Sequence, residues 1–433
     1  MWRLILIGIS IVLQAAHWSR KGIDLLAITI LLFLVFLFFK KRWMLNVTGI
    51  MLFAGSLEWI NTGIKLAQLR MRLGLPFTRL VIILAVVAIF TGWTAYLARS
   101  KKLRERFDQD LETSLSSTIA FVTATMILII AKIKTPLTIL LADRFYPGSG
   151  WITIFLFAVY GAFAAEKLSG SKSSVWRLRM WLLFSIVFFT QFFLGIAGLK
   201  IFMMTGEAHL PVPAMIAAGP IFRAAGFFMP ILYLITLFLL GPAWCSHLCY
   251  IGGWDNLSSL RKKIPGIFVK DPRMWQGIML AVLAAGAIIL RLFNLPYASI
   301  LIYGLVWGMT GIFVIVLLSG KNGTMVHCTS YCPIGFLSVL FAKIYPVKLK
   351  IEKKKCTLCL DCIPHCRFGA LDKDIIRSGF AGFSCTLCGD CIPSCPHDAF
   401  RITAFGSQSD NIRKIYLGLL AGIMAVFIAT ARI

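Results

Sequence analysis

Long runs of apolar residues, separated by short polar and basic segments, make up most of this 433-residue chain. A helix of about twenty apolar residues crosses a bilayer core of roughly 30 Å, and several runs reach that length. The pattern predicts about eleven transmembrane helices. We place them at 4–19, 23–39, 43–64, 77–97, 115–132, 150–166, 178–203, 224–244, 275–294, 298–318 and 412–431. The predicted fold class is therefore an all-α polytopic membrane protein.

A polar insert at roughly 345–411 interrupts this pattern just before the last predicted helix. We therefore expect four parts: a six-helix module of unknown role (1–170), a membrane core (171–344), the insert (345–411) and a C-terminal transmembrane helix (412–433). Within the core, only the residues LPY separate the helices at 275–294 and 298–318. Such a short link predicts a tight hairpin, so the residues before and after it share one membrane face.

The net charge of +26 would suggest a nucleic-acid partner in a soluble protein. Here Lys and Arg lie beside the ends of the predicted helices, which is the positive-inside bias of a protein in a lipid bilayer, and we expect no nucleic acid. One set of loops is much the richer in cations: 40–42, 99–106, 167–179, 261–263 and 353–355. This set should be cytoplasmic, which predicts an inner-membrane protein with the N-terminus and the insert inside and the C-terminus outside.

Eight of the 12 cysteines lie in the insert, in the segments CTLCLDCIPHC and CTLCGDCIPSC. Both have the spacing C-x2-C-x2-C-x3-C, and in two-cluster ferredoxins the fourth Cys of each run binds the other cluster. We assign one [4Fe–4S] cluster to Cys356, Cys359, Cys362 and Cys395, and a second to Cys385, Cys388, Cys391 and Cys366. Zinc is the alternative, but its four-cysteine sites use two separate CxxC pairs. The insert is therefore predicted to be a small α+β domain like the two-cluster bacterial ferredoxins.

The other four cysteines form a second duplicated element. CSHLCYIG carries Cys245 and Cys249, and CTSYCPIG carries Cys328 and Cys332. By the hairpin argument both elements lie at the same membrane face, and thiols four residues apart project from one side of a helical turn. Two such turns facing each other would offer four thiolates to a third iron–sulfur cluster. Redox-active or metal-handling thiols and buried structural thiols are the alternatives.

The chain resembles the NapH/NosR/CcoG-type membrane polyferredoxins, in which apolar hairpins carrying two C-x-x-x-C elements precede a two-cluster ferredoxin insert. The resemblance covers roughly residues 175–405. It implies electron transfer linked to quinones and to respiratory reductases, or the maturation of such enzymes. The sequence departs from that group at Tyr250, where Pro is usual, and Arg367 stands where the ferredoxin motif has Pro.

Few other electron or proton carriers are evident in the remaining sequence. No CxxCH occurs, so no covalently attached haem is expected, and electrons would cross the bilayer through a quinone or a partner subunit. Glu58 lies within a predicted span and is a candidate for a quinone-linked proton relay, or else a helix-end partner of Lys65. The basic run Lys353–Lys355 would guide an acidic soluble ferredoxin or flavodoxin, or anchor the insert beneath the membrane.

These observations predict an electron-transfer subunit of a larger redox complex, because no catalytic centre is evident. It would relay single electrons between a cytoplasmic donor or acceptor and the quinone pool or a membrane redox partner. The alternatives are a maturation or copper-reducing accessory protein of a respiratory reductase, and a redox-sensing regulator.

Overall fold

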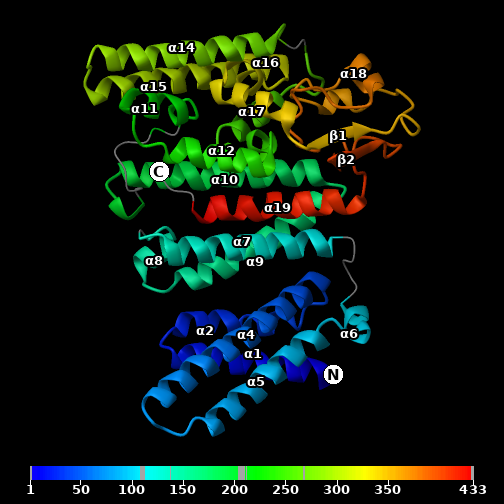
Figure 1. Cartoon of the computed structure of the whole chain (residues 1–433). Coiled ribbons are helices and arrows are strands. Elements are labelled where there is room, and N and C mark those ends of the chain that lie inside the picture. Colours follow the sequence, from blue (N-terminus) through cyan, green and yellow to red (C-terminus); the bar gives the residue numbers. More distant parts are fainter. Residues whose placement is uncertain are drawn as a thin grey trace. The chain divides into compact units, whose positions relative to one another are not determined.

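The computed structural model describes residues 2–107, 113–136, 138–202, 210, 212–266 and 269–430. The described part is mainly helical, with one two-stranded sheet (Figure 1). It divides into two compact units: Met1–Glu166 with Ala421–Ala429, and Lys167–Leu420 with Thr430–Ile433. The second unit joins the insert and the membrane core, which the sequence-based division treated as separate parts.

The first unit is built around aromatic packing. Phe33, Phe36, Phe121 and Phe155 form a buried cluster in which the Phe36 and Phe155 rings stack at 5.4 Å. Its helices are α1 (Trp2–Arg20), α2 (Asp24–Leu31), α3 (Phe33–Phe36), α4 (Arg42–Arg72), α5 (Thr78–Leu97), α6 (Lys101–Arg106), α7 (Ser114–Lys134), α8 (Leu141–Phe145) and α9 (Gly150–Ser169).

The second unit begins with the helices of the membrane core. These are α10 (Ser173–Ile196), η1 (Lys200–Phe202), α11 (Met215–Arg223), α12 (Phe228–Leu240), α13 (Gly252–Ser259), α14 (Pro272–Leu292), α15 (Tyr297–Phe313), α16 (Gly320–Asn322) and α17 (Pro333–Ile344). Three π-helical segments, η2 (Trp244–Leu248), η3 (Val314–Ser319) and η4 (His327–Tyr331), lie among them. The last helix, α19 (Asp410–Ala429), is divided: it belongs to the second unit up to Leu420 and to the first unit from Ala421. The LPY link joins α14 to α15 as an antiparallel hairpin (Figure 1).

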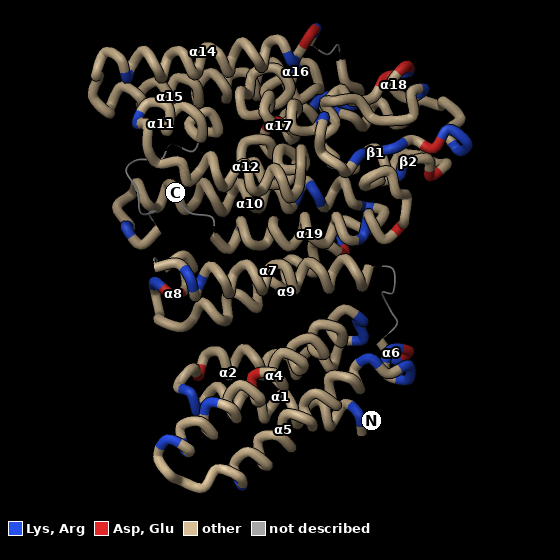
Figure 2. Tube along the Cα trace, viewed as in Figure 1, with Lys and Arg blue, Asp and Glu red and all other residues tan. Residues whose placement is uncertain are grey.

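Nine helices in the described part of the chain are long and apolar enough to cross a membrane, which fits a multi-pass membrane protein. Lys and Arg are almost absent from the middle of α14 and α15 (Figure 2). Two of the eleven predicted spans, 23–39 and 224–244, correspond to shorter apolar helices, Asp24–Phe36 and Phe228–Leu240. Glycines with positive φ set these lengths: Gly22 lies just before the first, and Gly226 and Gly241 flank the second.

The insert folds around one antiparallel strand pair, β1 (Val347–Ile351) and β2 (Phe400–Ala404), with Val347 opposite Ala404. Leu349, Ile351, Phe400 and Ile402 are buried, as the two-residue period of a half-covered sheet requires. The short helix α18 (Lys373–Ser378) starts at Asp372, whose Oδ1 accepts a hydrogen bond from the Ile375 amide at 2.7 Å. A 3₁₀ turn, η5 (Ile363–His365), completes the insert.

Candidate iron–sulfur sites

The eight cysteines of the insert line two separate cavities, each with four thiols. Cys356, Cys359, Cys362 and Cys395 line the first. Cys366, Cys385, Cys388 and Cys391 line the second. In each cavity three thiols come from one run and the fourth comes from the other run. This is the grouping expected from the motif, although ligation of iron by these residues stays a prediction.

The cysteine loops of the insert repeat the same backbone turns. Leu358 and its equivalent Leu387 have positive φ, as do Leu360 and its equivalent Gly389. Left-handed residues close to one another turn backbone amides inward and create a concavity suited to an anionic group. In addition, the amide of Ala370 donates to Cys366 Sγ at 3.2 Å. The loops therefore supply both thiols and amide donors, which is what a thiolate-bound cluster requires.

Burial favours the protonated form of the thiols in the second cavity as long as no metal is bound. It raises the pKa of Cys366, Cys385 and Cys388 to about 12. In the first cavity it raises the pKa of Cys362 to about 11, while Cys359 is exposed. Thiols lose their protons when they bind iron. The positive charge of the iron ions then offsets the cost of burying four thiolates. The residues of both cavities therefore fit a [4Fe–4S] cluster, and the first cavity is the more accessible from solvent.

The two CxxxC elements have the same local structure. Each forms a five-residue π turn, η2 or η4, that ends at the residue before its second cysteine. The amide of Cys249 donates to the Trp244 carbonyl at 3.1 Å, and the amide of Cys332 donates to the His327 carbonyl at 2.8 Å. A short helix then follows in each case, α13 or α17. The sequence duplication is thus a structural duplication.

The glycine that ends each motif is required by space. A Cβ on Gly252 would lie 2.3 Å from the buried Trp181 ring and 3.0 Å from the Cys245 carbonyl oxygen. A Cβ on Gly335 would lie 2.7 Å from Gln276 Nε2 and 3.0 Å from the Cys328 carbonyl oxygen. In both elements the glycine lets the following helix pack against the first cysteine of its own motif.

The structure brings the four thiols of these elements together in a buried region. Burial raises the pKa of Cys245, Cys249 and Cys332 to about 12, with a further increase from the negative charge of a neighbouring thiolate in each case. The amides of Ile251 and Gly252 donate toward Cys249. Those of Ile334 and Gly335 donate toward Cys332. Four thiols with paired amide donors fit an iron–sulfur cluster, as they do in the insert.

Two helices hold the CxxxC elements in place through their backbone carbonyls. On α10, Trp181 Nε1 donates to the Cys249 carbonyl at 2.6 Å, and one turn later Ser185 Oγ donates to the Tyr250 carbonyl at 2.5 Å. On α14, the buried Gln276 Nε2 donates to the Cys328 carbonyl at 2.9 Å. Each element is thus fixed by a polar side chain from a helix outside its own motif.

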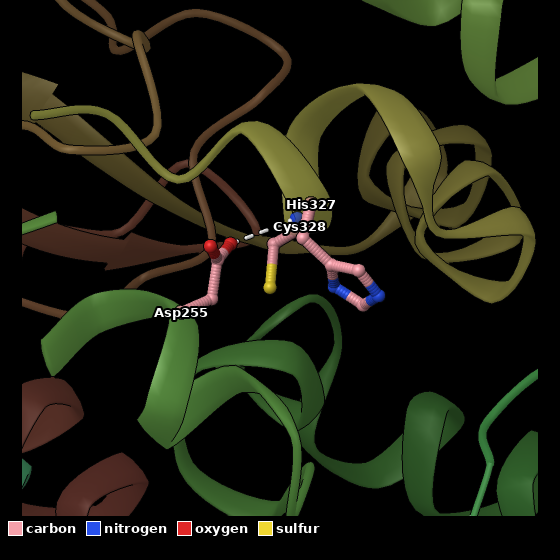
Figure 3. A group of neighbouring side chains, drawn as sticks. All are labelled: Asp255, His327 and Cys328. Carbon is pink, nitrogen blue, oxygen red and sulfur yellow. Dashed lines mark hydrogen bonds between the residues drawn. The ribbon is translucent and has the colours of Figure 1, made fainter. Parts of the chain in front are cut away.

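A buried acid lies beside the second element. Asp255 Oδ2 accepts a hydrogen bond from the Cys328 amide at 2.9 Å, and the Cys328 sulfur lies between this carboxylate and the His327 ring (Figure 3). One ligand atom from each of these three residues lies within 4.8 Å of the other two. Asp255 Oδ1 and His327 Nδ1 have no hydrogen-bond partner among the described residues. The three residues could therefore also hold a metal ion.

The insert packs directly on the membrane core. Ser246 Oγ donates to the Thr386 carbonyl at 3.0 Å, which joins the first CxxxC turn to the second cysteine run. Arg367 donates to the carbonyls of Gly323 at 2.6 Å and Lys263 at 2.8 Å. The arginine that replaces the usual proline therefore fastens the insert to the core. Tyr250, the other departure, stacks on Phe188 at 4.1 Å.

Glu58 lies in the first unit, whereas all twelve cysteines lie in the second. Its carboxylate pairs with Lys21 and accepts hydrogen bonds from Asn61 at 3.1 Å and Thr62 at 3.2 Å. The suggested partner Lys65 is therefore wrong: the cation comes from the turn between α1 and α2. A role of Glu58 in quinone or proton binding stays a prediction.

Three residues that shape the CxxxC site were not predicted from the sequence: Trp181, Gln276 and Asp255. The sequence could have indicated a role for Gln276, because a side-chain amide inside an apolar helix needs a buried hydrogen-bond partner. A fourth, Arg177, was assigned to the positive-inside bias of its loop, but its side chain is buried. A cation at a helix end is compatible with both roles, so the pattern alone could not separate them.

A family model described as "4Fe-4S binding domain" matches residues 222–267 and 304–352. These segments contain both CxxxC elements and exclude the eight cysteines of the insert. Neither the curated proteins nor the solved structures contain a match to the chain. The family match and the nine apolar helices together fit an iron–sulfur membrane protein.

Proposed function

We propose that this protein is a membrane-bound electron-transfer subunit that relays single electrons between a cytoplasmic donor or acceptor and the quinone pool or a membrane redox partner. One observation carries the proposal: the twelve cysteines form three groups of four, and contacts within one compact unit link the groups. When bound by such groups, [4Fe–4S] clusters accept and release single electrons. The two insert groups would each hold one cluster, and the CxxxC group a third.

The first cavity is suited to exchange with a soluble partner. Its Cys359 is exposed, and the exposed residues Lys353 and Lys354 precede the same cysteine run. A basic surface beside an accessible redox site attracts an acidic protein of the ferredoxin or flavodoxin kind. If the cation-rich loops are cytoplasmic, this surface faces the cytoplasm from the inner membrane.

The second cavity faces the CxxxC site. Its loop contacts the first CxxxC turn through Thr386, and a small apolar cluster of Trp181, Met325 and Phe368 packs against both Cys388 and Cys328. A cysteine of the insert and a cysteine of the core therefore contact the same buried apolar cluster. The three groups thus form a series from the exposed surface to the membrane core, which supports a relay and the proposed kinship to the NapH/NosR/CcoG-type proteins.

The relay can be tested with the full chain in lipid nanodiscs. Reduction by a soluble ferredoxin and reoxidation by a quinone analogue would be followed through the iron–sulfur absorbance. Reversing the charge of Lys353 and Lys354 to Glu should slow reduction by ferredoxin about tenfold at low salt, because electrostatic steering is lost. Reduction by dithionite should not change, and Lys373→Glu on the exposed side of α18 is the matched control. If none of the quinone analogues reoxidises the reduced protein, a quinone is not the acceptor.

A second candidate function is metal handling during the maturation of a respiratory reductase. The cluster of Asp255, His327 and Cys328 favours it, because these three residues could hold a metal ion. In that case, alkylation of the four CxxxC thiols should leave the iron content unchanged while abolishing function. Loss of about four irons on the same treatment would instead support a third cluster.

A further inference from the structure

A buried arginine links the insert to the first CxxxC turn. Arg177 lies in the first turns of α10, and its Nε and Nη2 donate to the two carboxylate oxygens of Asp390 at 2.8 and 2.5 Å. Its Nη1 donates to the Ser246 carbonyl at 3.1 Å. The side chains of Arg177 and Asp390 are only 2% and 13% exposed. One guanidinium therefore contacts a loop of the second cavity and a turn of the CxxxC site.

The internal repeat provides a comparison for this contact. Asp361 and Asp390 occupy equivalent positions in the two cysteine runs, yet Asp361 is exposed. Among the described residues, Asp390 of the second run is paired with the buried cation Arg177, and no such partner lies beside Asp361 of the first run. A carboxylate needed only by the loop itself would have similar surroundings in both runs.

We propose that the Arg177–Asp390 pair positions the second cysteine run on the CxxxC turn and balances the charge beside the second cavity, so that it sets the reduction potential there. The inference rests on the proposed electron-transfer function and deepens it. Arg177 is a positioning residue, because it touches the cysteine loops and not the electrons' donor or acceptor.

The physical basis is the neutrality of the pair. A buried carboxylate without its cation would disfavour the extra electron of a reduced cluster, and a buried guanidinium without its anion would favour that electron. The fork of the guanidinium also matters, because it reaches both Asp390 oxygens and the Ser246 carbonyl at once. A lysine would supply the charge, but its ammonium group lacks the planar fork that directs these three hydrogen bonds.

The test is a redox titration of the purified full chain, followed by electron paramagnetic resonance. The signal of the second cavity is identified as the paramagnetic resonance signal that is lost in a Cys388→Ser variant. Arg177→Gln should disfavour one-electron reduction at this cavity about tenfold, equivalent to about 59 mV. Asp390→Asn should favour reduction by a similar factor. The double variant should return to within about threefold of the unmodified protein, since the site is again neutral.

Two controls separate charge from folding. Asp361→Asn, at the equivalent exposed position, should leave this signal unchanged. Arg177→Lys should keep the potential but increase hydrogen exchange in segment 385–391, because the charge remains and the fork is lost.

Potential shifts of the same sign in Arg177→Gln and Asp390→Asn would overturn the proposal, as would no shift in either variant with its iron retained. This outcome is distinct from failure of the proposed function. If the CxxxC site held no cluster, the iron content would be lower, but the opposite shifts at the second cavity would remain.

Discussion

In the insert, thiols are carried by loops with left-handed residues, and the same run that supplies a thiol also supplies the amides around it. In the membrane core, thiols are carried by two π turns whose carbonyls are held by side chains from other helices. Both regions contain a repeated motif, a four-cysteine run in the insert and a two-cysteine element in the core. Their different supports indicate that the insert sites depend on local backbone conformation, while the CxxxC site depends on the packing of helices around it.

The largest expected effect comes from filling the space that the CxxxC site needs. Gly252→Ala would place a methyl group 2.3 Å from the fully buried Trp181 ring. We expect a loss of about 3 kcal/mol of stability, because the helices cannot separate without breaking the Trp181 hydrogen bond. Thermal unfolding of the purified protein measures this. Gly253→Ala, where the nearest atom is Ser185 Oγ at 3.3 Å, is the matched control and should be much milder.

Removing the support of the first CxxxC turn should have the next largest effect. Trp181→Phe keeps the aromatic packing but deletes the donor to the Cys249 carbonyl. A buried carbonyl without a partner costs about 2 kcal/mol, so the midpoint of thermal unfolding should fall. The variant should also lose iron from the CxxxC site before the insert loses any. The control Trp254→Phe changes a 37% exposed side chain; a fall as large in this control would show that the effect is not due to the hydrogen bond.

The second CxxxC turn offers a smaller version of the same test. Gln276→Met preserves the length of the side chain and removes the amide that donates to the Cys328 carbonyl. The expected loss is about 1 kcal/mol, because the Cys328 segment also retains the Asp255 contact to its amide. Thermal unfolding and iron content would report it. A larger effect than that of Trp181→Phe would show that the second turn depends more on its supporting helix than the first does.

The smallest effect on the iron content is expected in the insert. Gly389→Leu introduces the residue that the first repeat already has at the equivalent position, where Leu360 adopts a φ of +67°. The substitution should cost about 1 kcal/mol of backbone strain and leave the iron content unchanged. Iron loss from this variant, measured with the purified chain, would show that the two repeats do not tolerate the same side chains.

The same contrast explains what could be predicted from sequence. The grouping of the insert cysteines follows from the motif, because in two-cluster ferredoxins the fourth Cys of each run joins the other run, and the structure places the same sets on the two cavities. The common location of the two CxxxC turns follows from the short LPY link. Each of these two predictions rests on a short sequence feature: the first on the spacing of a motif, and the second on the length of one link between helices.

The supporting residues could not be predicted, because each contact joins segments far apart in the chain. Trp181 is one aromatic residue among many in an apolar helix, and only the fold shows that its indole reaches Cys249. Asp390 and Asp361 are equivalent in sequence, and only the fold brings Arg177 of α10 to one of them. For Glu58, the helical spacing suggested Lys65, but a turn elsewhere in the first unit supplied Lys21.

The most direct test of the account is the iron and acid-labile sulfide content of the purified full chain, compared with a variant carrying Cys249→Ser and Cys332→Ser. Three [4Fe–4S] clusters predict about twelve irons for the unmodified chain and about eight for the variant. About eight irons in both would contradict a cluster at the CxxxC site.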